Sequence, residues 1–346
     1  MTTEEKRVFI GQFYQSGRNI SDVLQEGMEW IDAASIIKNN TRVFIKPNLT
    51  WKVPTPGVTT TPIMLRAVVE ALTKITSYIS IVESDGGQQC FWAEDAFLSH
   101  GLYNLAHQFN IRVINLSKEP SKIITTQVDG KNIQVRLPSV LLEEMDFFIT
   151  MPVPKIHAMT RVSMAFKNQW GCLGNSMRVK DHPRFNKLIV AINKLLKPRL
   201  AICDGTYFLN KTGPMFGEAV RKNLLLVGDD IGAISLACSE IMGIDYRKVK
   251  HFQVARKEGM FPKMQNVRFN RHPRQFLTRQ FHLKRTPINY IQLAAFHNII
   301  LNKVFYDSFL ADAMHKMLWF ISKNLKIKKF LYGHFGPGEA KRHGVY

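Results

Sequence analysis

The sequence predicts an α/β protein: a mostly parallel sheet with crossover helices, a β-hairpin excursion and a basic helical C-terminal extension. Short β-branched runs alternate with helical patterns, which is typical of parallel strands joined by crossover helices. The 346 residues are 45% hydrophobic, so the chain can bury a large core. An Asp129-Gly130 dipeptide, which tolerates the positive φ angles of a tight turn, interrupts the alternation and predicts the hairpin.

The predicted elements follow one another regularly up to about Lys250. Strands are short runs rich in Val, Ile and Phe, and helices show a helical apolar period. One helix start is clear, because Thr61 suits the N-cap and Pro62 suits the first helical position. Strands are expected at 7–13, 41–45, 78–82, 112–116, 123–128, 132–137, 147–151, 200–203 and 224–227. Helices are expected at 21–36, 62–76, 160–170, 184–196 and 231–242, with further helical segments up to 110.

The pattern and the charge both change beyond this point, which divides the chain into an α/β domain at 1–250 and an extension at 251–346. The formal net charge is +20, and the extension carries 17 Lys and Arg against 4 Asp and Glu. Residues 288–330 are expected to form one or two helices with apolar residues all round, and such helices must be covered by protein or lipid. Apolar surface beside clustered lysines is typical of helices that bind anionic membranes, and packing on the α/β domain or on a second subunit is an at least equal alternative.

Binding to nucleic acid is not favoured, because the basic segment 268–285 belongs to no known nucleic-acid-binding module. The four cysteines are scattered without a C-x-x-C pair, so neither a disulfide framework nor a zinc site is indicated. The charged start does not resemble a signal peptide, and no stretch reaches the roughly 18–20 apolar residues that span a bilayer. We therefore expect a cytoplasmic protein, with membrane association on the cytoplasmic face left open.

Polar residues follow five of the predicted strands. In open parallel sheets, ligands bind beyond the carboxyl ends of the strands, so these groups should converge if the strands are parallel neighbours. The five segments are Lys46-Pro47-Asn48, Glu83-Ser84-Asp85-Gly86-Gly87, Pro152-Val153-Pro154-Lys155-Ile156-His157, Asp204-Gly205 and Gly228-Asp229-Asp230.

Three lysines and two asparagines are the expected ligand-binding residues. The lysines would hold a phosphate or carboxylate, and the amide side chains would orient the ligand. A lysine among apolar residues is either snorkelling or held inward by an anionic partner. The predicted set is Lys46, Asn48, Lys155, Lys167 and Asn168.

Two further residues, His157 and Asp204, are the expected proton carriers. The ordinary pKa of histidine lies near neutrality, so His157 suits general acid–base catalysis, although a hydrogen-bonded structural histidine is an equal alternative. An aspartate after a strand is often a helix cap or turn former, which is the alternative for Asp204. A divalent cation is left open, since four carboxylates would suit a hard metal ion: Glu83, Asp85, Asp204 and Asp229.

Several ordered motifs resemble the domain-of-unknown-function family 362, over roughly residues 5–250. The resemblance implies an α/β fold and a site lined by these residues, and it implies no known reaction. Many members of that family carry ferredoxin-like cysteine clusters, but this chain has none, so no iron–sulfur cluster is expected. The matching motifs are Val43–Asn48, Thr60-Thr61-Pro62, Pro154-Lys155-Ile156-His157, Phe166–Gly171, Asp204-Gly205, Gly213–Gly217 and Gly228–Gly243.

The function expected from these residues is an enzyme that acts on an anionic small molecule or a lipid-linked intermediate. The sequence lacks the P-loop, dinucleotide-binding, nucleophile-elbow and H-E-x-x-H patterns, so the reaction type is left unresolved. A non-catalytic ligand- or membrane-surface-binding protein is the first alternative. Racemase-like or redox chemistry on a hydroxy acid is the second, since the motif order is loosely similar to the nickel-pincer lactate racemases. A homo-oligomer is left open.

Overall fold

Ten strands of the described chain form the main sheet of the computed structural model, which describes residues 5–14 and 17–307. The order along the sheet is β12-β1-β11-β10-β7-β2-β3-β4, and β8 and β9 pair beside β10. The strands are β1 (Lys6–Gln12), β2 (Val43–Lys46), β3 (Ile79–Glu83), β4 (Arg112–Asn115), β7 (Phe147–Thr150), β8 (Lys155–His157), β9 (Arg161–Ser163), β10 (Leu200–Asn210), β11 (Glu218–Gly228) and β12 (Val267–Phe269). The predicted fold class is confirmed.

The five adjacent strands β10, β7, β2, β3 and β4 run parallel to one another. The chain passes outward from β2 to β3 and β4, and then returns to β7 on the other side of β2. The winding direction therefore reverses between β2 and β7. In doubly wound α/β sheets, ligands bind beyond the carboxyl ends of the strands at such a reversal.

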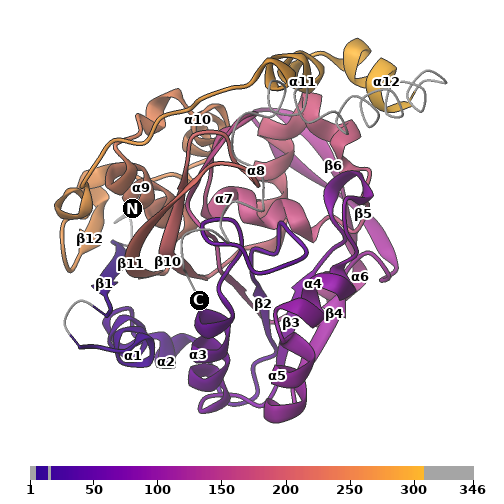
Figure 1. Cartoon of the computed structure of the whole chain (residues 1–346). Helices are drawn as coiled ribbons and strands as arrows, with labels where there is room; N and C mark the ends of the chain where they lie inside the picture. Colours follow the sequence, from indigo (N-terminus) through magenta and orange to yellow (C-terminus); the bar gives the residue numbers. More distant parts are fainter. Residues whose placement is uncertain (1–4, 15–16, 308–346) are drawn as a thin grey trace.

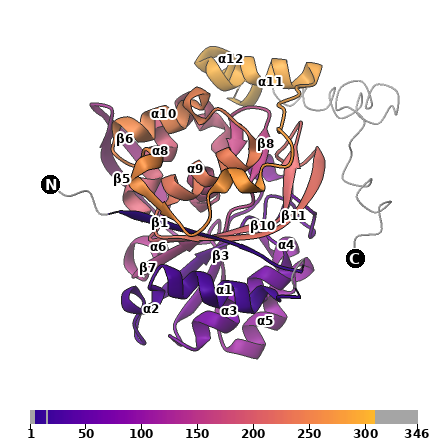
Figure 2. The same cartoon turned by 90° about the vertical axis from the view of Figure 1, so that its left-hand side faces the viewer.

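Helices cover both faces of the sheet, as Figure 2 shows with the sheet edge-on. Alternate residues of each strand point to opposite faces, so Val43 and Ile45 join one buried cluster and Phe44 joins the other. One face packs on α1 (Ile20–Trp30), α3 (Pro62–Thr73), α4 (Ala93–Ser99) and α5 (Leu102–Phe109); the other packs on α8 (Phe185–Leu196), α9 (Ile231–Met242) and α10 (Lys250–Lys257). The short helices α2 (Ala33–Ile36), α6 (Ser139–Glu143) and α7 (Ala165–Asn168) complete this part of the chain.

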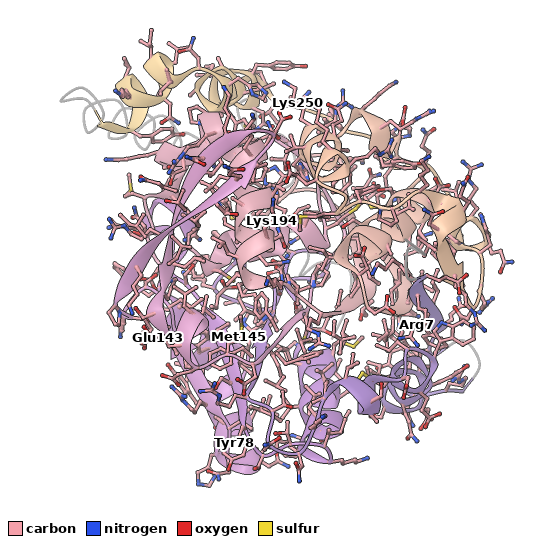
Figure 3. The ribbon with its side chains drawn as sticks, turned by 180° about the vertical axis from the view of Figure 1, so that it is seen from behind. Arg7, Tyr78, Glu143, Met145, Lys194 and Lys250 are labelled. Carbon is pink, nitrogen blue, oxygen red and sulfur yellow. The ribbon has the colours of Figure 1, made fainter. Side chains whose placement is uncertain are left out.

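The predicted hairpin forms a separate two-stranded sheet from β5 (Ser121–Val128) and β6 (Lys131–Pro138). Its turn residues Asp129 and Gly130 have φ angles of 51° and 69°, as a tight hairpin turn requires. Lys194 of α8, labelled in Figure 3, donates to the Gln127 carbonyl at 2.8 Å and pairs with Glu258 at 2.7 Å. The hairpin is thereby attached to the helical layer.

Two expectations for individual elements are wrong. The segment 160–170 is not one helix, because Arg161–Ser163 forms β9 against β8 and a short helix begins only at Ala165. The strand β11 runs antiparallel to β10, so its carboxyl end lies at the opposite edge of the sheet from the other polar strand ends. Asp229 there pairs with Arg7 at 2.8 Å (Arg7 is labelled in Figure 3), and Asp230 caps α9 by accepting from the Ala233 N–H at 2.7 Å.

The C-terminal segment returns to the sheet before it forms helices. The strand β12 pairs in parallel with β1, and α11 (Pro287–His297) and α12 (Ile299–Asp307) follow. Figures 1 and 2 show α11 and α12 together at the periphery, beyond the layer of α8 and α10. The part of the predicted helical region after residue 307 lies outside the described residues. Among those that are described, no helix is long and apolar enough to cross a membrane.

Candidate functional site

A small cavity of about 80 Å³ lies beyond the carboxyl ends of β2 and β3. The polypeptide reaches it from four directions: the end of β2, the glycine-containing loop after β3, the α7 region, and the 3₁₀ segment Arg178–Arg184. Its lining includes four of the predicted ligand-binding residues, Lys46, Asn48, Lys167 and Asn168. The remaining lining residues are Leu49, Thr50, Glu83, Ser84, Gly86, Gly87, Phe91, Ser163, Trp170, Gly171 and Arg178.

The base of the cavity holds a buried ion pair. Lys46 Nζ lies 2.5 Å from Glu83 Oε2, and the two side chains are only 2% and 5% exposed. The same ammonium donates to the Pro47 carbonyl at 2.7 Å, while the carboxylate accepts the Leu49 and Ser84 N–H groups. The charge of Lys46 is therefore offset within the protein, and the pair is well supplied with hydrogen bonds.

Gly171 allows the chain to pass directly over this pair. A Cβ atom at this position would lie 2.6 Å from Glu83 Oε1, closer than Cβ atoms pack, and a tight 3.0 Å from Lys46 Nζ, so the buried ion pair would have to shift. The motif around residues 166–171 thus needs glycine because of close approach rather than because of a special backbone angle.

The two asparagines serve different purposes. Asn168 Nδ2 donates to the Lys46 carbonyl at 3.0 Å and to Thr150 Oγ1 at 2.9 Å, so it bridges the ends of β2 and β7 at the reversal of the sheet. Asn48 is only 4% exposed, and its Oδ1 has no hydrogen-bond partner among the described residues. A buried amide oxygen without a partner is costly, so Asn48 Oδ1 is an open hydrogen-bond acceptor in the lining of the cavity.

Lys167 and Arg178 are cations of the cavity that lack a direct ion-pair partner among the described residues, although the nearby carboxylates of Glu83 and Asp85 favour the charge of Arg178. Neither makes an ion pair with any described carboxylate, and Lys167 Nζ lies 6.0 Å from the centroid of the Phe185 ring. Arg178 is held by carbonyl and hydroxyl oxygens, including Asp85 O at 2.9 Å and Ser84 Oγ at 3.1 Å. Burial, with a smaller contribution from the nearby Arg178 charge, lowers the pKa of Lys167 to about 7.

A cluster of basic groups continues from Lys167 into the protein. Burial lowers the pKa of His157, Lys155, His182 and His251, and repulsion from Lys167 adds to the effect in each case. His157 Nδ1 accepts the Met159 N–H at 3.1 Å, so its neutral ring carries the proton on Nε2. Lys155 Nζ donates to the Val58 carbonyl. Lys155 and His157 therefore lie behind the cavity rather than in its lining.

The structure does not bring Asp204 into the cavity. Its carboxylate accepts from Thr61 N and Oγ1 at 2.7 and 2.8 Å and from Thr206 N and Oγ1 at 3.0 and 2.6 Å. These four hydrogen bonds hold the start of α3 against β10. Asp204 therefore has the helix-cap or turn-forming role that was the alternative to proton transfer. The four carboxylates considered as metal ligands do not converge, and no group of three or more His, Cys, Asp or Glu in the described ranges could hold a metal ion.

Sequence reasoning missed the two side chains that decide the charge of the cavity. Glu83 was considered only as a metal ligand, whereas it neutralises Lys46. Arg178 was not among the predicted binding residues, although its guanidinium lines the cavity. The sequence does hold a signal for it, because a cluster of basic residues at 178–184 follows the Gly171–Gly174 turn.

Comparison with known proteins places these motifs in a family. The chain is 25% identical over 299 residues to the thylakoid-associated protein sll1697 of Synechocystis sp., covering 81% of this chain and 88% of that protein. A crystal structure of a Thermotoga maritima protein superposes with a TM-score of 0.42 at 12% identity, covering 63% of this chain and 58% of that one. The family described as Domain of unknown function (DUF362) matches residues 43–240, which confirms the resemblance seen in the sequence: the chain belongs to the DUF362 family.

Proposed function

We propose that the chain is an enzyme that binds an anionic molecule, bearing phosphate or carboxylate, at the cavity beyond β2 and β3. Lys167 and Arg178 contact the anionic group, and Asn48 Oδ1 accepts a hydrogen bond from a neighbouring hydroxyl or N–H of the ligand. The observation that carries this proposal is a pair of cations without ion-pair partners: Lys167 and Arg178 line the cavity and neither pairs directly with a described carboxylate.

The charge of the cavity supports an anion of charge −1 to −2. Lys46 and Glu83 offset one another, so Lys167 and Arg178 supply the remaining positive charge. A cavity of about 80 Å³ accommodates one phosphate or carboxylate group rather than a whole metabolite, so the rest of the ligand extends outward. Free phosphate esters, hydroxy acids and the head group of a lipid-linked intermediate all meet this description.

Lys167 is also the best-placed proton carrier. A pKa of about 7 leaves it partly protonated near neutral pH, which is the range in which a general acid or base works best. His157 carries its proton on Nε2 behind Lys167 and belongs to the same basic cluster. We therefore assign Lys167 the proton-transfer role and His157 a supporting one, while Asp204 holds α3 in place.

The proposal is tested by screening a panel of sugar phosphates, prenyl phosphates and hydroxy acids for stabilisation of the purified chain against heat. Lys167→Met and Arg178→Met are each expected to weaken binding of the best ligand about 10- to 100-fold, because hydrogen bonds to charged groups contribute roughly 1.5–3 kcal/mol. Affinity should also fall as the pH rises above 7, because Lys167 then loses the proton that the anion needs, and Lys167→Arg should reduce this dependence.

Lys131→Met is the matched control, because Lys131 is exposed on the hairpin strand β6. It should leave binding unchanged, and Lys167→Met should not lower the melting temperature, since it removes a buried cation without an ion-pair partner. Equal affinity in all three variants would refute the proposed pocket. A ligand that binds through both residues but is never converted would identify a non-catalytic binding protein instead.

Association with a membrane surface is a second candidate function. The relative from Synechocystis sp. is named as thylakoid-associated, and several large apolar side chains of α11 and α12 are exposed in this chain. This candidate concerns where the protein acts and is independent of the ligand in the cavity.

A further inference from the structure

The outer faces of α11 and α12 expose a set of large apolar side chains. Ile299 and Ile300 are 62% and 69% exposed, at the junction between the two helices. Such side chains are common singly on a protein surface, but several on adjacent turns indicate an interaction site. The exposed set, termed here the α11–α12 face, consists of Tyr290, Ile291, Ile299, Ile300, Leu301 and Val304.

The inner faces of the same helices are firmly attached to the protein. Phe296 packs against His182 and Phe185, with ring centroids 4.7 and 5.6 Å apart. Asn302 is buried and donates to the Val179 carbonyl at 3.1 Å. Since Val179 and His182 belong to the segment that also carries Arg178 of the cavity, α11 and α12 rest directly on a wall of the candidate site.

The sequence around the α11–α12 face is basic. Residues 259–306 include eight Lys and Arg and no Asp or Glu, and the one acid of the two helices is Asp307 at the end of α12. Lys284, Arg285 and Lys303 lie on or beside the two helices, and none of them pairs with a carboxylate of the described chain. An apolar surface bordered by cations is the combination by which peripheral proteins bind anionic bilayers.

We propose that the α11–α12 face is the surface by which this chain docks on a bilayer that contains anionic lipids. This inference rests on the membrane association proposed above, and it identifies the surface and the lipid charge. The isoleucines at the helix junction enter the boundary between head groups and acyl chains, while Lys284, Arg285 and Lys303 contact anionic head groups.

A bilayer suits this face better than a second copy of the chain. A symmetric contact would place the same unpaired cations of two copies against one another, and like charges in a contact oppose association. Docking on a bilayer pairs each cation with an anionic lipid. In this orientation, the layer of α11 and α12 lies between the head groups and the cavity wall that carries Arg178. This arrangement suits an anionic substrate held in the membrane.

The test is co-sedimentation of the full chain with vesicles of phosphatidylcholine containing 30% phosphatidylglycerol, compared with vesicles of phosphatidylcholine alone. The wild-type chain should sediment with the anionic vesicles, and added salt should weaken binding. The double variant Ile299→Glu/Ile300→Glu should lose at least about 10-fold in partitioning, because it places two charges where apolar contact is needed. Leu98→Glu is the matched control: Leu98 is 71% exposed on α4, and its replacement should change nothing.

Three results would overturn the inference. No binding of the wild-type chain at low salt would remove membrane association altogether. Binding that the double variant retains would place the contact elsewhere on the chain, while membrane association itself would stand. A dimer in light scattering that the double variant converts to a monomer would identify a second copy as the occupant. If the double variant proves unstable, Tyr290→Glu/Ile291→Glu tests the same face on α11, and none of these results depends on the ligand of the cavity.

Discussion

The free energy of unfolding should fall by on the order of 4 kcal/mol when the pH is lowered from 6 to 5. Four histidines remain neutral in the folded chain because burial lowers their pKa, to about 4 for His100, about 3 for His182 and His251, and well below 6.5 for His157. In the unfolded chain each would titrate near 6.5. The unfolded state therefore binds more protons as the pH falls. Each histidine contributes about 1 kcal/mol against folding between pH 6 and 5, approaching the limit of about 1.4 kcal/mol per pH unit at lower pH.

Urea denaturation at pH 7, 6 and 5 measures this effect. Stability conferred by the neutral histidines is complete above pH 6.5 and is lost progressively as the pH falls toward their folded pKa values of about 3 to 4. His100→Gln should reduce the dependence of the unfolding free energy on pH by the contribution of one histidine. A stability that is level between pH 7 and 5 would show that these rings are hydrated or paired in solution.

The second large effect is expected at the ion pair beneath the cavity. Glu83→Gln should lower the free energy of unfolding by about 3–5 kcal/mol, because it leaves the buried ammonium of Lys46 without its counter-charge. Replacing both partners, in Lys46→Met/Glu83→Leu, should recover much of this loss, since a well-packed apolar pair avoids the cost of a buried charge. Chemical denaturation of the single and double variants provides the measurement.

The exposed pair Arg42–Asp146 is the control for this comparison. Its side chains are 46% and 42% exposed, so Asp146→Asn should cost no more than about 1 kcal/mol. If Glu83→Gln lowers the free energy of unfolding as little as Asp146→Asn does, then water reaches Lys46 freely, and Glu83 is not needed to neutralise it. If the double variant is no more stable than Glu83→Gln, the hydrogen bonds from Leu49 and Ser84 matter more than the charge.

Local chemistry was enough to predict much of the fold. Thr61 caps α3 and Pro62 occupies its first turn, as the residue types predict. The direction of β11 was missed because the predicted strands at 200–203 and 224–227 left about 20 residues between them, enough for a crossover. The real strands extend to Asn210 and begin again at Glu218, and so short a connection allows only an antiparallel pair.

Residues that directly follow a strand could be placed at the cavity from the sequence, whereas partners that come from other parts of the chain could not. Lys46 and Asn48 line the cavity because they end β2, and this position can be seen in the sequence. Their chemistry could not be seen there, since Glu83 neutralises Lys46 from a neighbouring strand, while no described group satisfies Asn48 Oδ1. Asp204 was expected to carry protons, but its carboxylate accepts hydrogen bonds from Thr61 and Thr206. Thr61 lies 143 positions away in the sequence.

The most direct test of anion binding in the cavity is a crystal of the full chain soaked in tungstate, an oxyanion that anomalous scattering locates without ambiguity. A peak is expected in the cavity beyond β2 and β3, with the oxygens of tungstate about 2.7–3.2 Å from Lys167 Nζ and the Arg178 guanidinium. The peak should be absent from crystals of Arg178→Met. An empty cavity at pH 6.5, with tungstate bound only at surface lysines, would contradict the proposal that this site binds anions.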